Sequence, residues 1–288
     1  PNMKPPQNID FIRQFMTTRM KRAAPNCFGG DAHAFELRPP IDAQKLAALL
    51  QSLAAPADYV EFLAEAGTHG AGPGYGLLPP VNCCGWEHPF PAGHDWAPDM
   101  ANPAEVGVVE GLGGDYYSDF WTHGCIALAD WGCGVVSLLL VNAPAPVQGR
   151  VFIDVRWAGE GIRQTHASFR EFYESWLELV ERGDSGVNVN IPRGTCANWN
   201  ALDNYLGAAR QRLGAQLTED SVLRTLRDIP DGGIAQLTDE DSAYYRSGDS
   251  LRPCPACSER IRDYVARGFM RPGQLAPGDD LRALREWR

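Results

Sequence analysis

Two cysteines in the last part of the chain, Cys254 and Cys257, have the spacing of a redox dithiol or of half a metal site. At a helix N-terminus the helix dipole would lower the pKa of such a thiol. A thioredoxin-type site also needs a buried strand just before the pair, and residues 247–253 do not have that pattern. A zinc site needs two further ligands, and Cys196 would have to come from a distant loop. We therefore expect a helix cap with free thiols and keep both cysteines only as weak metal candidates.

A second group of potential ligands lies in a long irregular stretch over residues 79–122. Its spacing fits no standard zinc module, so we expect a loop with unrelated side chains at Cys83, Cys84, His88 and His94. The carboxylate pair Asp115 and Asp119 could serve as an acid and a base, but its polar surroundings favour a surface role. We expect His123 and His166 to make ordinary hydrogen bonds.

Two glycine-containing segments resemble catalytic loops only in part. Residues 183–186 (Gly-Asp-Ser-Gly) lack the third glycine and the histidine of a serine-protease site. The alternating glycines of residues 67–76 follow a predicted helix and lack a phosphate-binding lysine, so we expect a structural loop. We predict no catalytic residue and no cofactor.

Charge is distributed unevenly along the 288 residues. The net charge is −10, yet residues 46–149 contain eleven acidic residues and no Lys or Arg. Such a segment repels nucleic acid and attracts a cationic partner. The alternative is that its acidic loops only keep the protein soluble.

Composition limits the class of protein further. Thirty Gly and 22 Pro favour many turns over a helical bundle, and no apolar run is long enough to cross a membrane. The first ten residues lack the pattern of a secretion signal. We therefore expect a cytoplasmic protein with mostly reduced thiols, binding neither nucleic acid nor membrane.

Periodicity predicts the elements that would position these residues. Residues 41–53 have helical spacing at Leu46, Leu49, Leu50 and Leu53. A second helix follows, with Tyr59, Phe62 and Leu63 facing inward. Strands are predicted over residues 125–128, 135–141 and 151–155. Ser168 caps a further helix whose buried face is Phe169, Phe172, Tyr173, Trp176, Leu177 and Val180.

The two ends of the chain are predicted to be helical. Residues 11–22 form a basic amphipathic segment that we expect to dock on its own domain. Residues 183–200 have the composition of a connector. The region beyond this connector is predicted to be helical. Its last predicted helix contains the apolar residues Ile261, Tyr264 and Val265 and ends near Gly268.

Three segments together resemble the SMI1/KNR4 (SUKH) family. Residues 55–67 (APADYVEFLAEAG) resemble the family's LPxxYxxFL helix and the Gly loop that follows it. Residues 124–134 (GCIALADWGCG) resemble its strand and turn. Residues 168–177 (SFREFYESWL) resemble its closing helix. Ala55 departs from the usual Leu. The resemblance implies an α+β domain over residues 41–182, with a curved, mostly antiparallel sheet flanked by helices. An N-terminal extension (1–40) precedes it and a mainly helical region (183–288) packs on it.

The family includes immunity proteins that neutralise bacterial toxins, so the resemblance implies a non-catalytic binding protein. We expect a monomer, or a 1:1 heterodimer with a cognate, basic toxin whose active site it occludes. A regulatory scaffold is the first alternative, and a zinc or redox protein using Cys254 and Cys257 is the second. Aromatic anchors and negative charge predict the partner-binding residues Trp86, Glu87, Asp95, Trp96, Asp115, Tyr116, Tyr117, Asp119 and Trp121.

Overall fold

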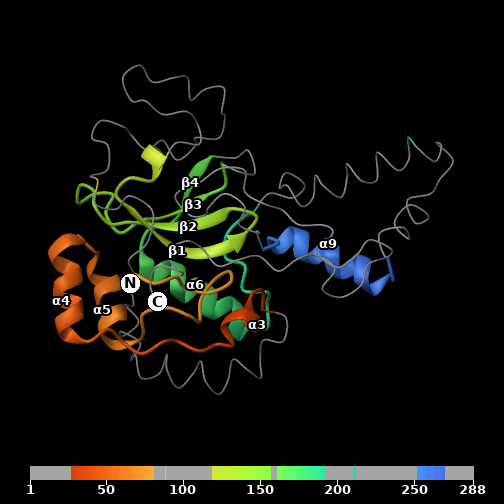
Figure 1. Cartoon of the computed structure of the whole chain (residues 1–288), viewed down its shortest axis with the longest axis horizontal. Helices are drawn as coiled ribbons and strands as arrows, with labels where there is room; N and C mark the ends of the chain where they lie inside the picture. Colours follow the sequence, from red (N-terminus) through yellow and green to blue (C-terminus); the bar gives the residue numbers. More distant parts are fainter. Residues whose placement is uncertain are drawn as a thin grey trace, which may run out of the picture.

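Four antiparallel strands form the centre of the structure, a computed structural model that describes residues 27–80, 88, 119–156, 161–191, 211 and 252–269. The strands follow one another in the sheet in chain order (Figure 1). They are β1 (Cys125–Gly132), β2 (Val135–Leu140), β3 (Val151–Asp154) and β4 (Ile162–His166). Helices pack around this sheet, so the α+β class is confirmed.

The first three strands are the predicted ones, and the fourth was missed. Every residue of β1, β2 and β3 is buried, because both faces of these strands are covered, and their sequences are accordingly almost continuously apolar. In β4 only the two end residues, Ile162 and His166, are buried. Its three central residues are polar and half-exposed, which hid the strand from a search for apolar runs.

Six helical segments accompany the sheet in the described residues. They are α3 (Gly30–His33), α4 (Ala43–Ser52), α5 (Ala57–Glu65), the 3₁₀ turn η2 (Asp119–Thr122), α6 (Phe169–Glu181) and α9 (Pro255–Ala266). The predicted inner face of α5 is confirmed. In α4 the apolar pattern was partly misleading, since Leu49 and Leu53 are buried but Leu50 is 38% exposed.

Helix α6 carries the largest part of the core. Ser168 caps it as predicted, because its side chain accepts a hydrogen bond from the backbone N–H of Glu171. All six residues predicted for its inner face are buried. They pack with strand residues and with the inner face of α5, where Phe62 makes edge contacts with Phe169 and Tyr173.

The main core reaches beyond residues 41–182. Phe28 and Phe35, from the segment predicted as an N-terminal extension, are buried in it, and so is Val189 on the C-terminal side. The backbone N–H of Phe28 donates to the carbonyl oxygen of Ser185, so these two flanking segments also meet each other. Both therefore help to build the sheet-and-helix body.

The glycine-rich loop of residues 67–76 has the structural role predicted for it. At Gly74, φ is 65° and an added Cβ would lie 2.2 Å from the carbonyl oxygen of Asp130. The next residue, Tyr75, donates its N–H to that same oxygen. Glycine thus allows the loop to lie directly against β1.

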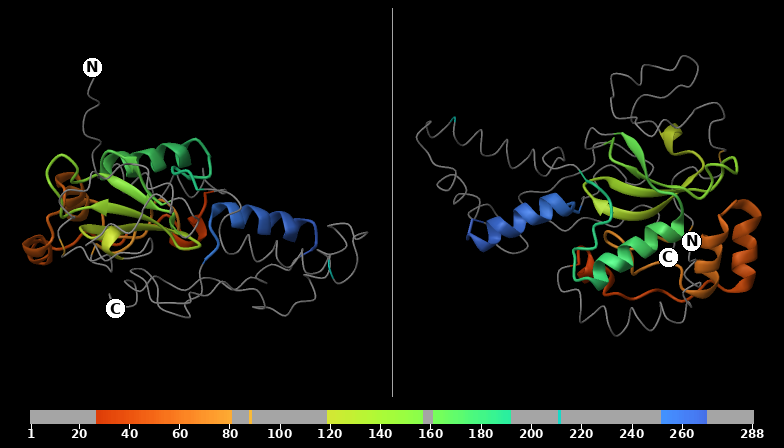
Figure 2. Two further views of the ribbon diagram at one scale, coloured as in Figure 1. Left: turned by 90° about the horizontal axis from the view of Figure 1, so that it is seen from above. Right: turned by 180° about the vertical axis from the view of Figure 1, so that it is seen from behind.

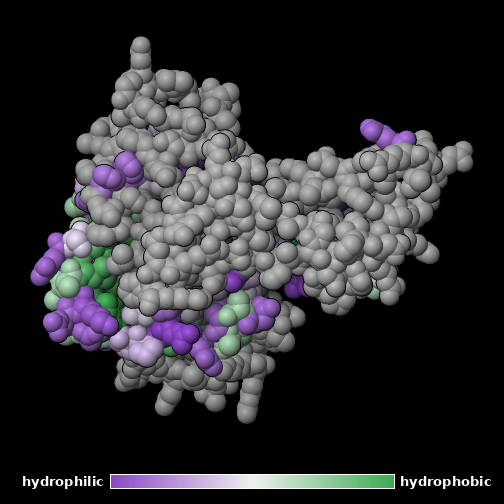
Figure 3. Space-filling model, in the orientation of Figure 1, coloured by the Kyte–Doolittle hydropathy of each residue, from purple (hydrophilic) through white to green (hydrophobic). Residues whose placement is uncertain are grey.

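Helix α9 meets the rest of the described body at one end. Figures 1 and 2 show it beginning beside the β1–β2 turn and running outward from the sheet, while α6 covers one sheet face. Figure 3 shows hydrophilic and apolar side chains mixed on the described part of the visible face. Among the described residues, no helix has the length and apolar character needed to cross a bilayer.

A buried ion pair closes the end of β3. The guanidinium of Arg156 donates to both carboxylate oxygens of Asp154 through Nε and Nη2, the shortest hydrogen bond being 2.7 Å, and both side chains are almost fully buried. Removing one partner would take this ion pair and its hydrogen bonds away from a charge that stays buried.

We expect Arg156→Ala to lower the free energy of unfolding by about 3–5 kcal/mol. The control Arg182→Ala removes an exposed pair with Glu178 and should cost less than about 0.5 kcal/mol. Urea denaturation of both variants measures the difference. Equal small losses would show that the buried pair contributes no more than the exposed one.

His33 is a buried base in the core. Its Nδ1 accepts the N–H of Phe35, its ring packs edge-on against Trp176, and its Nε2 has no hydrogen-bond partner. Burial lowers the pKa of His33 from 6.5 to about 4, against an opposing effect of Asp31. Between these values the unfolded chain binds the proton more readily, so stability falls as the pH drops from 6.5 towards 4.

We expect His33 to account for a loss of about 3 kcal/mol in unfolding free energy between pH 7 and pH 4. Burial also lowers the pKa of His69 and of His166, so the effect must be isolated by difference. His33→Asn keeps an acceptor near the Nδ1 position and cannot titrate in this range. Denaturation at several pH values should give a flatter profile for the variant; an unchanged slope would contradict this role of His33.

Candidate functional site

The predicted partner-binding residues fall almost entirely outside the described part of the chain. Seven of the nine lie there: Trp86, Glu87, Asp95, Trp96, Asp115, Tyr116 and Tyr117. Asp119 begins η2, and Trp121 in the same turn is buried, with 9% of its surface exposed. The interface stays a prediction.

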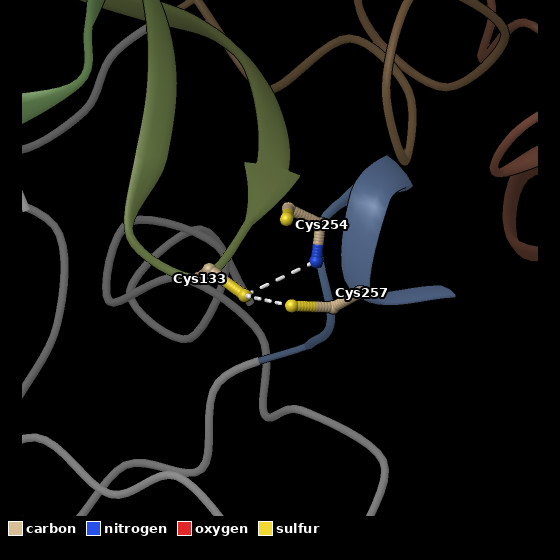
Figure 4. A group of neighbouring side chains, drawn as sticks. All are labelled: Cys133, Cys254 and Cys257. Carbon is tan, nitrogen blue, oxygen red and sulfur yellow. Dashed lines mark hydrogen bonds between the residues drawn. The ribbon is translucent and has the colours of Figure 1, made fainter. Parts of the chain in front are cut away.

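The structure instead brings three buried cysteines together. Cys254 and Cys257 lie at the start of α9, and Cys133 reaches them from the turn between β1 and β2 (Figure 4). The three Sγ atoms lie within 4.8 Å of one another, and the exposed fraction of each residue is 2% or less. We call this group the cysteine cluster.

The β1–β2 turn positions Cys133. Gly132 pairs with Val135, which leaves only Cys133 and Gly134 to connect the strands. Both have positive φ, 53° and 79°, the pattern of a type I′ hairpin turn. Asn, Asp or Gly usually occupies the first of these positions, so a cysteine there holds an unfavourable backbone conformation.

Backbone contacts hold the other two cysteines against this turn. The N–H of Cys133 donates to the carbonyl oxygen of Arg252 at 2.6 Å, and the hydroxyl of Tyr75 donates to that of Pro253 at 2.6 Å. The guanidinium of Arg252 also lies over the Tyr75 ring. The glycine-rich loop, the hairpin and the start of α9 are thereby joined at one place.

Cys254 occupies the N-cap position of α9, as the helix-cap interpretation requires, but its side chain makes no capping hydrogen bond. Its backbone N–H donates to Sγ of Cys133 at 3.2 Å. The sulfur atoms therefore gather at the positive end of the helix dipole, where a thiolate is favoured.

The distances between the sulfur atoms define what the cluster can do. Sγ of Cys133 lies 3.9 Å from Sγ of Cys257. A disulfide needs about 2.0 Å, whereas two thiolates on one tetrahedral zinc ion stand about 3.8 Å apart, given Zn–S bonds of about 2.3 Å. None of the five described cysteines forms a disulfide. The arrangement has the spacing of metal ligands.

Sequence reasoning found two members of this cluster and missed the third. It named Cys196 as the residue that would have to complete the site, and Cys196 lies outside the described residues. The sequence feature that could have pointed to Cys133 is its position between two glycines, in the short connection between two predicted strands.

The loop cysteines and histidines proposed as a second metal group are mostly beyond the described residues. Cys83, Cys84 and His94 lie outside them. His88 is described, and its ring centroid lies 4.6 Å from that of His123.

One serine–histidine pair has the spacing of a nucleophile and its base. Oγ of Ser175 lies 3.1 Å from Nε2 of His166, which confirms a hydrogen bond for that histidine. The hydroxyl proton, however, is directed to the carbonyl oxygen of Phe172, and the side-chain amide of Asn188 donates to Oγ of Ser175. Because its proton and a lone pair are already engaged, this serine is held as a structural residue of α6.

The other described nucleophiles of the core are similarly inert. Burial raises the pKa of Cys27 to about 11, and burial also raises the pKa of Cys125. Both thiols therefore remain protonated at neutral pH, where thiolate is the reactive form. Ser185, in the Gly-Asp-Ser-Gly segment, is an exposed residue of irregular backbone whose carbonyl oxygen accepts the backbone N–H of Phe28.

Comparisons of this chain with protein families, with curated proteins and with solved structures gave no match.

Proposed function

We propose that this chain is a non-catalytic immunity protein that binds a cognate toxin and neutralises it by covering the active site. The SMI1/KNR4 (SUKH) resemblance supports this, because its three motifs fall on α5, on β1 with its turn, and on α6. These elements have the expected order around an antiparallel sheet. A curved sheet and a mainly helical region packed on it belong to the same proposal.

Surface charge is the observation that carries the proposal. Helix α5, within the segment free of Lys and Arg, presents Asp58, Glu61 and Glu65. It already attracts a cation within the chain, since the guanidinium of Arg170 forms an ion pair with Glu61 at 2.9 Å. The backbone N–H of the same residue donates to the carboxylate of Asp58. A basic partner would be drawn to such a surface, which speeds encounter and favours the correct orientation.

The described core fits a binding role better than a catalytic one. Motif residues such as Phe62 and Trp176 are buried packing residues, so they specify a fold without supplying chemistry. A cytoplasmic location agrees with the absence of a disulfide among the five described cysteines. The recognition surface is then the acidic, aromatic-rich stretch that contains the nine predicted partner-binding residues.

Co-expression provides the direct test. We expect the chain to restore growth of a bacterial host that produces the secreted effector encoded beside its gene, and to form a 1:1 complex with that effector. The readouts are colony survival and the mass of the purified complex. Binding without protection would support the regulatory-scaffold alternative. The absence of both binding and protection would refute the proposal.

The double substitution Asp115→Arg and Asp119→Arg should weaken effector binding roughly tenfold or more, because it places positive charge in the proposed interface. Calorimetry at two salt concentrations measures this. The control Glu181→Arg with Asp184→Arg makes the same change in net charge at exposed positions outside the acidic segment. An equal loss in both double variants would assign the effect to overall charge, and no loss would remove the segment from the interface.

A further inference from the structure

We propose that Cys133, Cys254 and Cys257 bind one Zn²⁺ ion as thiolates and that this ion fastens α9 to the β1–β2 turn. This inference does not rest on the proposed toxin binding. Three thiolates fill three positions of a tetrahedral ion, and the fourth is left for water or another donor. Sulfur-rich tetrahedral sites select zinc among the common divalent cations.

The geometry of the cluster supports this assignment. All three sulfur atoms lie within 4.8 Å of one another, and the 3.9 Å between Cys133 and Cys257 is close to the separation of about 3.8 Å on a shared zinc ion. The ligands come from two rigid elements, a two-residue turn and the first turn of a 12-residue helix. Little rearrangement is needed for an ion to enter.

The electrostatics of the cluster also favour a cation. Zinc binding would convert three thiols to thiolates and release their three protons to solvent, leaving the zinc and three thiolates with a net charge of −1. The N–H of Cys254 already donates to Sγ of Cys133, and the α9 dipole places partial positive charge at the same end. Without a metal ion, buried thiolates would be strongly unfavourable, because their charge would be uncompensated.

A redox dithiol explains the same residues less well. Redox exchange needs two cysteines, and the attacking one must be accessible to a partner. Here a third cysteine joins the pair, and all three are buried. The third, Cys133, occupies a turn position that normally requires Asn, Asp or Gly, and metal ligation gives a physical reason for a cysteine there.

The small size of the joint indicates what the metal would do. Among the described residues, the apolar cluster between the turn and α9 contains four buried residues, the three cysteines and Ala256, with Ile191 and Ile261 partly buried beside them. So few small side chains bury little apolar surface for a helix of this length. Coordination would join two segments that are 121 residues apart in the chain.

Metal analysis of the full chain, purified without chelator, should give about one zinc per molecule. Cys133→Ser and Cys257→Ser should each lower zinc affinity by at least about tenfold. Cys125→Ala is the matched control, because it removes a buried thiol of β1 that lies outside the cluster. Zinc retained in both serine variants, or lost in the alanine control alone, would overturn the assignment.

A titration of the wild-type chain keeps the test independent of variant folding. After removal of metal by a chelator under reducing conditions, Co²⁺ should bind once per chain and give thiolate charge-transfer absorption with the visible bands of a tetrahedral site. Zn²⁺ should displace the cobalt. A reduced chain that binds neither ion, or that yields a Cys133–Cys257 disulfide in place of a metal complex, would refute the proposal.

Hydrogen exchange then tests the mechanical role. Amide exchange in α9 should become roughly tenfold faster when zinc is removed, while amides of β2 should change little. If the chain binds one zinc ion but amide exchange in α9 does not change when the zinc is removed, the fastening role is contradicted and the assignment of the zinc site still holds. All these readouts are independent of toxin binding, so they separate this proposal from the immunity function.

Discussion

The close approach of two backbone segments at the end of the β1–β2 hairpin is the constraint on which the rest of this arrangement depends. A Cβ on Gly132 would lie 2.6 Å from the carbonyl oxygens of both Arg252 and Pro253, so only glycine fits. This contact lets Cys133 bond to the segment before α9 and brings its sulfur to the two helix cysteines.

The core supplies the rigid support for that contact. Helix α6 packs its six buried side chains among strand and helix residues, and Trp131 of β1 donates to Ser137 of β2 across the hairpin at 2.8 Å. Gly74 then brings the glycine-rich loop against Asp130, so that Tyr75 reaches Pro253. The residues of the three motifs are therefore largely packing residues, and both proposals made for this chain draw instead on surface charge and on the cysteine cluster.

Local pattern was sufficient for much of the fold, because the deciding interactions lie within a few residues. The Ser168 cap, the inner faces of α5 and α6, and three strands were all predictable from spacing and turn residues. The fourth strand was not, since β4 is polar and is identified by its pairing with β3. The helical spacing of residues 41–53 predicted α4 but not which of its leucines are covered: Leu50 is exposed, because an apolar residue at helical spacing is buried only where a neighbouring element covers it.

The sequence by itself determined that residues 46–149 carry negative charge alone, and that Cys254 and Cys257 are spaced to share a ligand at the start of a helix. Both properties follow from composition and short-range spacing. Only the tertiary structure decided that Cys133 is the third member of that group. Its sulfur is brought there by hairpin closure and by the backbone contact at Gly132, and no local pattern encodes contacts between segments 121 residues apart.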